Sequence, residues 1–209
     1  VRNFVVGTDF KLPADTPADA HYLVVPSPLK TLQRLAERHR DRFDIPVVGI
    51  TGSNGKTIVK EWLYQLLSAD TVVTRSPRSW NSQIGVPLSV WLLDDHSRTG
   101  LFEAGISQPG EMEALRDIVR PTMGVFTYLG EAHQENFPSL QQKCTEKLSL
   151  FKDSDKIVCC TDDLVVRRSL AAARLTGEVV NWSKTDRTAR LFVVKVTKDQ
   201  HKSTISYEY

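Results

Sequence analysis

The amino-acid sequence predicts an α/β fold with a doubly wound, mostly parallel sheet. From residue 45 onward, apolar segments of strand length alternate with amphipathic segments of helix length. Strict alternation of this kind implies right-handed crossovers and parallel strands that are covered on both faces. In addition, the turn TGSNGKT at residues 51–57 joins the first of these strands to the first helix, as a phosphate-binding P-loop does. The ligands of such a sheet bind at the carboxyl ends of its strands.

A short β-β-α part precedes this alternation. Residues 3–6 and 21–25 are predicted strands, and a helix follows with Ser27 as its cap and Pro28 at its first position. Pro46 marks the end of this part, because a proline confines the residue before it to extended conformations.

Five strands and five helices alternate in the main part of the chain. The strands are predicted at residues 47–51, 71–74, 101–106, 123–129 and 156–160, and the helices at 58–68, 84–93, 109–119, 139–151 and 164–174. Beyond Gly177 the pattern changes to strands alone. There, residues 191–197 and 203–209 are predicted to form an antiparallel hairpin, a C-terminal extension of the sheet.

Two of the predicted helices have apolar stripes that we expect to face the core. In the first helix the stripe consists of Leu29, Leu32, Leu35 and Ala36. In the helix at 58–68 it consists of Ile58, Val59, Trp62, Leu63, Leu66 and Leu67.

Composition excludes several classes of protein. The 209 residues include 41% hydrophobic residues, and 27 basic and 25 acidic residues are scattered without a basic block, which argues against a nucleic-acid partner. No apolar run approaches the roughly 20 residues that span a bilayer. There is also no signal-peptide pattern, so we expect a cytoplasmic protein without a membrane partner. Cys144, Cys159 and Cys160 form no Cys-x-x-Cys pair and are expected to be buried or half-buried free thiols.

The turn after the first strand of the main part is predicted to bind the phosphates of a nucleotide. Its backbone N–H groups and the positive end of a helix starting at Thr57 point into one concavity. Lys56 can neutralise the outer phosphates, and the Thr57 hydroxyl can bind Mg²⁺. The spacing departs from a strict Walker A motif, because Ile50 stands where the first glycine is usual. The predicted nucleotide-binding residues are Thr51, Gly52, Ser53, Asn54, Gly55, Lys56 and Thr57.

Three later residues have two interpretations each on chemistry alone. Glu103, at the end of a predicted strand, is either a metal ligand or a solvated carboxylate. His133, in a loop, is either a ligand or a histidine bonded to the backbone. Lys147 is either a solvated charge or, if its pKa is lowered, a neutral amine that can add carbon dioxide.

The stretch GITGSNGKT at 49–57 resembles the phosphate loop of the Mur ligases, which join amino acids or peptides to a carboxylate at the expense of ATP. Three further stretches resemble that family in the same order: RSWNSQIGVPLSV at 78–90, LFEAGISQPGEMEAL at 101–115 and GEAHQENFPSLQQKCTEKLSLF at 130–151. The resemblance covers residues 45 to 165. It is greatest to the MurF branch, including ligases of that branch that are fused to an alanine racemase.

The resemblance implies a set of site residues and cofactors. ATP and Mg²⁺ are the implied cofactors, and the implied catalytic residues are Lys56, Glu103, His133 and Lys147. The implied Mg²⁺ ligands are Thr57, Glu103, His133 and Lys147 as its carbamate. Asn81 matches the first Asn of the family's substrate loop, although Ser82 and Gln83 depart from the residues usual after it. Cys160 stands where the family has an Asn near the adenine.

The resemblance also implies the reaction and the domains. The activity would be ATP-dependent addition of D-alanyl-D-alanine to UDP-N-acetylmuramoyl-tripeptide through an acyl phosphate, a step of peptidoglycan precursor synthesis. Residues 1–44 would be a remnant of the N-terminal UDP-substrate domain, and 45–209 the central ATP-binding domain. Because the family's C-terminal domain has no counterpart here, we expect a piece of a longer protein that is inactive by itself.

Other functions remain open at this point. A folylpolyglutamate synthase-like ligase uses the same loop and chemistry on a folate. A P-loop kinase or a nucleotide-binding module would need the loop. It would not need Glu103, His133 and Lys147 as ligands. A purely structural domain has no need of the Gly-Ser-Asn-Gly-Lys-Thr turn.

Overall fold

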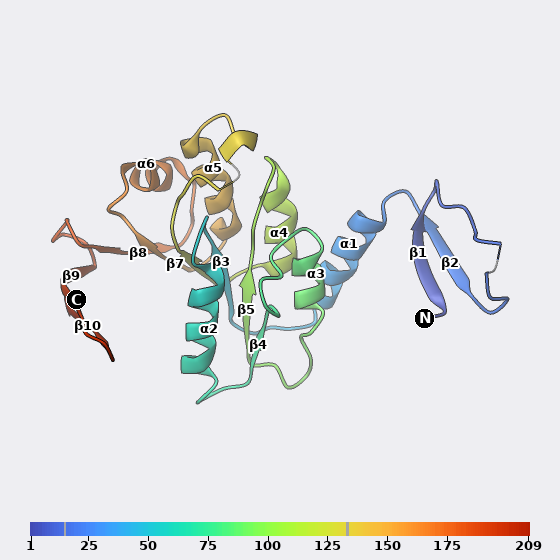
Figure 1. The fold of residues 1–209 in the computed structure, drawn as a ribbon, viewed down its shortest axis with the longest axis horizontal. Coiled ribbons are helices and arrows are strands. Elements are labelled where there is room, and N and C mark those ends of the chain that lie inside the picture. The colour runs from blue at the N-terminus through green and yellow to red at the C-terminus, as the bar shows by residue number, and fades with distance from the viewer. Residues whose placement is uncertain (15, 133) are drawn as a thin grey trace.

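The computed structural model describes residues 1–14, 16–132 and 134–209. Ten strands are found in them: β1 Asn3–Gly7, β2 His21–Val25, β3 Val47–Thr51, β4 Val73–Arg75, β5 Thr99–Glu103, β6 Met123–Phe126, β7 Lys156–Cys160, β8 Glu178–Ser183, β9 Leu191–Lys198 and β10 Ser203–Glu208. The first two pair with each other in parallel, and the other eight form one sheet in the order β10-β9-β8-β7-β6-β3-β5-β4. Figure 1 shows the small sheet at one end of the molecule and the β9–β10 hairpin at the other.

The helices lie between the strands in the chain. They are α1 Pro28–Arg40, α2 Lys56–Leu67, α3 Gly85–Val90, α4 Glu111–Val119, α5 Leu140–Leu148 and α6 Leu164–Ala172, with 3₁₀ turns η1 Gln134–Asn136 and η2 Ser149–Phe151. The α1 helix begins as predicted, since Ser27 Oγ accepts from the Lys30 N–H and a proline occupies its first turn. None of the helices in the described residues is long and apolar enough to cross a bilayer.

The sheet confirms the predicted fold class. Its neighbouring strands from β4 to β9 pair in parallel, and only β10 runs antiparallel, to β9. The chain adds β4 and β5 on one side of β3, then crosses to add β6 on the other side. The carboxyl end of β3 is therefore the switch point at which doubly wound sheets bind ligands.

One strand was not predicted individually. The β8 strand pairs with β7 and with β9, so the C-terminal hairpin continues the main sheet. Its sequence EVVNWS has polar residues at both ends and an asparagine within. That composition weakens the strand pattern, and pairing with β7 supplies the stability that local propensity lacks.

Several element ends differ from the predicted ones. The β5 and β6 strands end at Glu103 and Phe126, earlier than predicted, although apolar residues continue after them. The α2 helix begins at Lys56, two residues earlier than the predicted range. The α5 helix tightens into the 3₁₀ turn η2 at Ser149. The segments after β5 and β6 are loops at the carboxyl edge of the sheet, where the candidate site lies.

Two hydrophobic clusters occupy the two faces of the sheet. The larger one joins buried residues of α1, α3, α4, α5 and α6 to strand residues such as Phe102 and Phe126. The smaller one contains Val48, Ile50 and Leu101, against which α2 packs. Because side chains alternate along a strand, neighbouring residues such as Leu101 and Phe102 enter different clusters.

The predicted inward stripe of α2 is half wrong. Val59, Leu63 and Leu67 pack on the smaller cluster as predicted. Ile58, Trp62 and Leu66, however, are 57%, 64% and 71% exposed. One helix lying on a sheet buries only one stripe, and the apolar residues of α2 extend around more of its circumference than the sheet covers.

The predicted stripe of α1 is also partly wrong, since Leu29 and Leu35 are exposed. The helix packs on the main body through Ala36 and Arg40, both of them buried. Arg40 Nε donates to Val119 O at 3.1 Å, so α1 is joined to the end of α4 by a polar contact that an apolar stripe could not reveal.

The three cysteines have the predicted state. Cys144 and Cys159 are buried, Cys160 is half-buried and all three are free. Burial raises the pKa of Cys144 to about 11 and that of Cys159 to about 12, so both are neutral thiols at physiological pH.

Candidate functional site

The turn between β3 and α2 has a backbone that depends on two of its glycines. Gly52 has φ of 144° and Gly55 has φ of 83°, values that side-chain-bearing residues rarely adopt. A Cβ at Gly52 would lie 2.1 Å from Thr127 Oγ1 and 3.0 Å from the backbone nitrogen of Tyr128. The turn therefore approaches the segment after β6 so closely that only glycine fits.

Hydrogen bonds join this turn to the segment after β6. The Ser53 N–H donates to Tyr128 O at 2.7 Å, and Ser53 Oγ donates to Gly130 O at 3.0 Å. Thr127 Oγ1 donates to Asn54 O at 2.6 Å. The loop is therefore preorganised by the protein itself, which lowers the entropy lost when a ligand binds.

The N-terminus of α2 opens toward this loop. Gly55 is its N-cap residue, and no side chain in the described part of the chain caps the helix there. Its first N–H groups and the positive end of its dipole are available to an anion. Lys56 Nζ donates to Gly52 O at 2.9 Å and borders the same space. Burial lowers the pKa of Lys56, and the negative charge of Glu103 opposes that shift.

Glu103 and Thr57 meet beside the loop. Glu103 ends β5 and is fully buried, and its Oε2 accepts from Thr57 Oγ1 at 3.0 Å and from Asn81 Nδ2 at 3.4 Å. Adjacent oxygen ligands of an octahedral Mg²⁺ lie about 2.9 Å apart. These two oxygens therefore fit the spacing of a Mg²⁺ site, as the sequence predicts for both residues.

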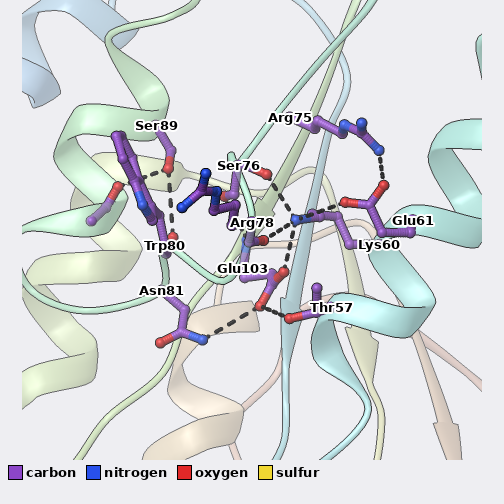
Figure 2. Close-up of polar contacts among 11 residues, drawn as sticks. Thr57, Lys60, Glu61, Arg75, Ser76, Arg78, Trp80, Asn81, Ser89 and Glu103 are labelled. Atoms are coloured by element: carbon purple, nitrogen blue, oxygen red, sulfur yellow. Dashed lines mark hydrogen bonds and ion pairs between the residues drawn. The ribbon is translucent and has the colours of Figure 1, made fainter.

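Lys60 is part of this site and was missed by the sequence analysis. Its side chain is fully buried, and Nζ lies 3.0 Å from Glu103 Oε1 and 3.1 Å from Glu61 Oε1. It also donates to Ser76 O at 2.8 Å and to Arg78 O (Figure 2). The only signal in the sequence is its position one turn after Lys56, on the side of the helix that faces the sheet.

Asn81 lies where the loop after β4 meets the loop after β5. The Gly105 N–H donates to Asn81 O at 2.7 Å, and a Cβ at Gly105 would lie 2.8 Å from Asn81 Oδ1. This close approach directs the Asn81 amide to Glu103. The structure thus brings the predicted substrate residue next to the predicted metal ligand.

Lys147 on α5 borders the same space from the opposite side. It is only 3% exposed, and its pKa is lowered to about 8 by burial first and then by the charges of Lys56 and Lys143. Lys143, one turn earlier and also buried, donates from Nζ to Gly130 O at 2.6 Å. A lysine in this environment has a much larger neutral fraction at physiological pH than a solvated one.

One cavity of about 560 Å³ is bordered by Lys56, Asn81 and Lys147, with Thr57 and Glu103 behind its wall. Residues from separate parts of the chain line it: Leu29, then Gly52, Ser53 and Lys56, then Asn81, Ser82, Gln83 and Ile84, then Gly105, Ile106, Ser107 and Glu111, then Ala132 and Lys147. Figure 2 shows Thr57, Asn81 and Glu103 converging from α2, the 76–81 loop and β5.

Thr51 and Cys160 are not among the residues that line this cavity. His133 lies outside the described residues. Thr51 is buried and its hydroxyl donates to Ala104 O at 2.7 Å, so it joins β3 to the end of β5. Cys160, which replaces the Asn that the family has near the adenine, is half-buried at the end of β7.

Comparison with known sequences gives the family. Residues 50–208 match the family described as the Mur ligase middle domain. A curated relative, the UDP-N-acetylmuramoyl-tripeptide–D-alanyl-D-alanine ligase of Borreliella burgdorferi, is 36% identical over 126 residues, which cover 60% of this chain and 27% of the relative. The chain thus spans less than a third of that enzyme's length.

Solved structures have the same fold. MurF from Acinetobacter baumannii superposes with a TM-score of 0.82 at 22% identity, covering 94% of this chain and 43% of that one. MurF from Thermotoga maritima, solved in complex with ADP, superposes with a TM-score of 0.79 at 26% identity, covering 93% and 45%. The family match extends over most of the sequence and agrees with the observed sheet and loop, so this chain belongs to the family of Mur ligase middle domains.

Proposed function

We propose that this chain carries the ATP-binding part of a ligase that adds D-alanyl-D-alanine to UDP-N-acetylmuramoyl-tripeptide. The observation that carries the proposal is the single cavity in which Gly52 and Lys56 of the glycine loop lie together with Asn81 and Lys147. The curated relative's activity supports the choice of substrates. The ADP in the Thermotoga maritima structure supports the choice of nucleotide. A cytoplasmic location, where ATP is at hand, belongs to the same proposal.

The reaction would proceed in two steps. A carboxylate is a poor electrophile, so the γ-phosphate of ATP is first transferred to a carboxylate oxygen of the tripeptide, which gives an acyl phosphate and ADP. The free amine of D-alanyl-D-alanine then attacks the acyl carbon and loses a proton. The C–O bond to phosphate breaks as the amide forms, and inorganic phosphate leaves.

Residues of the glycine loop would bind and orient the phosphates. The uncapped N-terminus of α2 and the Lys56 ammonium group offset the negative charge that spreads over the transferred phosphoryl group. Lys56 would exchange its present hydrogen bond to Gly52 O for phosphate oxygens. Asn81, on the other side of Glu103, would face the muramyl peptide.

The residues present fit a Mg²⁺ ion, and the ion would supply neutralisation of phosphate charge. Mg²⁺ in nucleotide sites is bound by one or two carboxylates together with substrate phosphates and water. Glu103 would contribute the carboxylate and Thr57 the hydroxyl, since their oxygens lie 3.0 Å apart. His133 remains a proposed ligand.

Lys147 would contribute a second carboxylate after modification. Its neutral amine adds to carbon dioxide, so that a C–N bond forms, one proton leaves and a carbamate anion results. A nearly complete burial and the neighbouring charge of Lys56 favour the neutral amine that this addition requires. The resulting anion would lie among Lys56 and Lys143, which stabilise negative charge.

Carbamate formation is tested by carbon-13 NMR in ¹³C-bicarbonate. We expect one carbamate resonance in the wild-type chain and its loss in Lys147→Met. Lys152→Met, which removes an exposed lysine shortly after the same helix, should keep the resonance. A spectrum that is unchanged in Lys147→Met would contradict the assignment.

Ligase activity is tested in the longer protein that contains residues 1–209, because residues 1–44 and 45–209 are proposed to be a tail of the UDP-substrate domain and the ATP-binding domain. We expect ADP release that depends on UDP-N-acetylmuramoyl-tripeptide and on D-alanyl-D-alanine. Replacing the tripeptide by a folate and the dipeptide by glutamate should abolish turnover. Turnover with the folate instead would assign a folylpolyglutamate synthase activity. The 209-residue chain alone should bind ATP without multiple turnover.

A further inference from the structure

The ammonium group of Lys60 joins three separate segments of the chain. From α2 it reaches Glu103 at the end of β5 and the carbonyl groups of Ser76 and Arg78 in the loop after β4 (Figure 2). A lysine is almost never fully buried unless its charge is paired and its donors are satisfied. Both conditions are met here, so the burial reflects a specific arrangement of these segments.

The two oxygens of Glu103 have different partners as a result. Oε1 forms the ion pair with Lys60 at 3.0 Å and accepts no hydrogen bond in the described residues. Oε2 accepts from Thr57 and Asn81. With Oε1 paired to Lys60, Oε2 is the oxygen that contacts Thr57 and Asn81. A carboxylate that offered this one oxygen would suit a Mg²⁺ ion, which is held by few protein ligands together with phosphates and water.

The loop that Lys60 contacts has a strained backbone. Arg78 has φ of 47°, in the left-handed region that residues other than glycine seldom adopt. Such a conformation persists where surrounding contacts impose it. The hydrogen bonds from Lys60 to Ser76 O and Arg78 O are contacts of that kind. Asn81, three residues after Arg78, lines the cavity.

We propose that Lys60 is a positioning residue that couples the phosphate loop, residues 51–57, to the segment 76–81 that carries Asn81. It directs Glu103 Oε2 toward Thr57 and fixes the 76–81 segment that carries Asn81. The inference has two halves. The metal half, that Lys60 orients Glu103 for Mg²⁺, rests on the proposed function. The loop half, that Lys60 fixes the 76–81 segment, does not. Lys60 and Glu103 are both behind the cavity wall, whereas Asn81 lines it, so Lys60 would act on ligands through the residues that it positions.

Three single variants separate these roles. Lys60→Met removes both the ion pair and the carbonyl contacts. Glu103→Gln keeps the carbonyl contacts and removes the carboxylate. Glu61→Gln is the matched control, because Glu61 also pairs with Lys60 but is half exposed and has Arg75 as a second partner.

Hydrogen exchange measures the loop half without any ligand. The Trp80 amide, which donates to Pro77 O at 3.1 Å, reports on the loop. Loss of two hydrogen bonds in Lys60→Met should speed its exchange by on the order of tenfold. Glu103→Gln and Glu61→Gln should leave it unchanged. Equal exchange in Lys60→Met and the wild type would overturn the loop half.

Calorimetry of ATP binding with and without Mg²⁺ measures the metal half. Loss of a group that orients a metal ligand costs about 10- to 100-fold in metal affinity. The gain in ATP affinity from Mg²⁺ should therefore fall by that factor in Lys60→Met and in Glu103→Gln. It should be kept in Glu61→Gln, and Mg²⁺-free binding should stay similar in all. A purely structural role would lower both affinities together.

A fourth variant separates a folding defect of Lys60→Met from the loss of its positioning role. Lys60→Met leaves the Glu103 charge buried without its partner, which can prevent folding. The double variant Lys60→Met/Glu103→Gln removes that charge and should fold, yet still show fast exchange at Trp80. Lack of ATP binding by the wild-type chain would overturn the proposed function and the metal half. Wild-type binding with an unaltered Mg²⁺ gain in Lys60→Met would overturn the inference alone.

Discussion

Thr57 Oγ1 donates a hydrogen bond to Glu103 Oε2 across 3.0 Å, although 46 positions separate the two residues in the chain. Thr57 lies in the first turn of α2, which follows β3, and Glu103 is the last residue of β5, the neighbour of β3. Parallel pairing brings the ends of these strands to one edge of the sheet. The pairing of β3 with β5 thus creates the candidate metal site from two distant motifs.

The hydroxyl of Thr57 should be required for metal-dependent nucleotide binding. In Thr57→Ala the gain in ATP affinity on addition of Mg²⁺ should fall by about 10- to 100-fold, because an oxygen ligand and its bond to Glu103 are both lost. Thr57→Ser keeps the hydroxyl and should retain most of the gain. Isothermal titration calorimetry with and without Mg²⁺ measures both. The hypothesis fails if alanine and serine behave alike.

A side chain at Gly52 should close the phosphate loop to nucleotides. Gly52→Ala would place Cβ 2.1 Å from Thr127 Oγ1, so the loop must move and ATP affinity should fall by more than tenfold. Gly110→Ala is the matched control: its φ is 84°, and nothing lies within 4 Å of an added Cβ. The control should lose about 1–2 kcal/mol of stability, from backbone strain, and keep ATP binding. Urea denaturation and calorimetry measure the two effects.

The lowered pKa of Lys147 should make stability depend on pH. Its pKa falls from 10.5 to about 8 on folding. Between these values the unfolded chain binds more protons than the folded chain, so the free energy of unfolding rises with pH across that window. Below pH 8 both states are protonated, and the buried charge remains a constant destabilising contribution.

Comparison with Lys147→Met isolates this contribution from other titrating groups. Relative to the wild type, the variant should be more stable at pH 7, and the difference should shrink toward pH 10. Urea denaturation in buffers free of carbon dioxide, which prevents carbamate formation, measures the free energies. Parallel pH profiles for the two proteins would contradict the assigned shift.

Arg40 should be needed to hold α1 against the main body of the protein. Arg40→Met removes the hydrogen bond to Val119 O and leaves a buried carbonyl without a donor, which should cost about 2–3 kcal/mol. Arg38→Met, on the exposed side of the same helix, should change stability by less than about 0.5 kcal/mol. Thermal and urea denaturation of both variants test the difference, and equal losses would refute the assigned role.

The regular alternation of segments was sufficient to predict the fold class. Strand and helix patterns are local, because a strand repeats every two residues and a helix every 3.6. For the same reason the glycine turn could be placed between β3 and α2, and Glu103 on the strand β5. These features depend on neighbours in the chain and hence can be inferred from its order alone.

Burial and pairing across the fold could not be inferred in this way. Trp62 and Lys60 lie on one helix, and their residue types suggest that the tryptophan is buried and the lysine solvated. The structure has the opposite arrangement, with Trp62 exposed and Lys60 fully buried. The reason is non-local: the end of β5 and the loop after β4 present Glu103 and two backbone carbonyls to Lys60, whereas no described segment covers Trp62.

Periodicity indicates which residues share a face of a helix, but the partner of that face decides whether a charge or an aromatic ring belongs there. For Glu103 that partner is a lysine 43 positions earlier in the sequence, which its neighbours in the chain do not indicate. The order of residues thus accounts for the elements and for the phosphate loop. The arrangement of the site around that loop depends on an ion pair between distant residues. This pair can form only when β3 and β5 lie side by side.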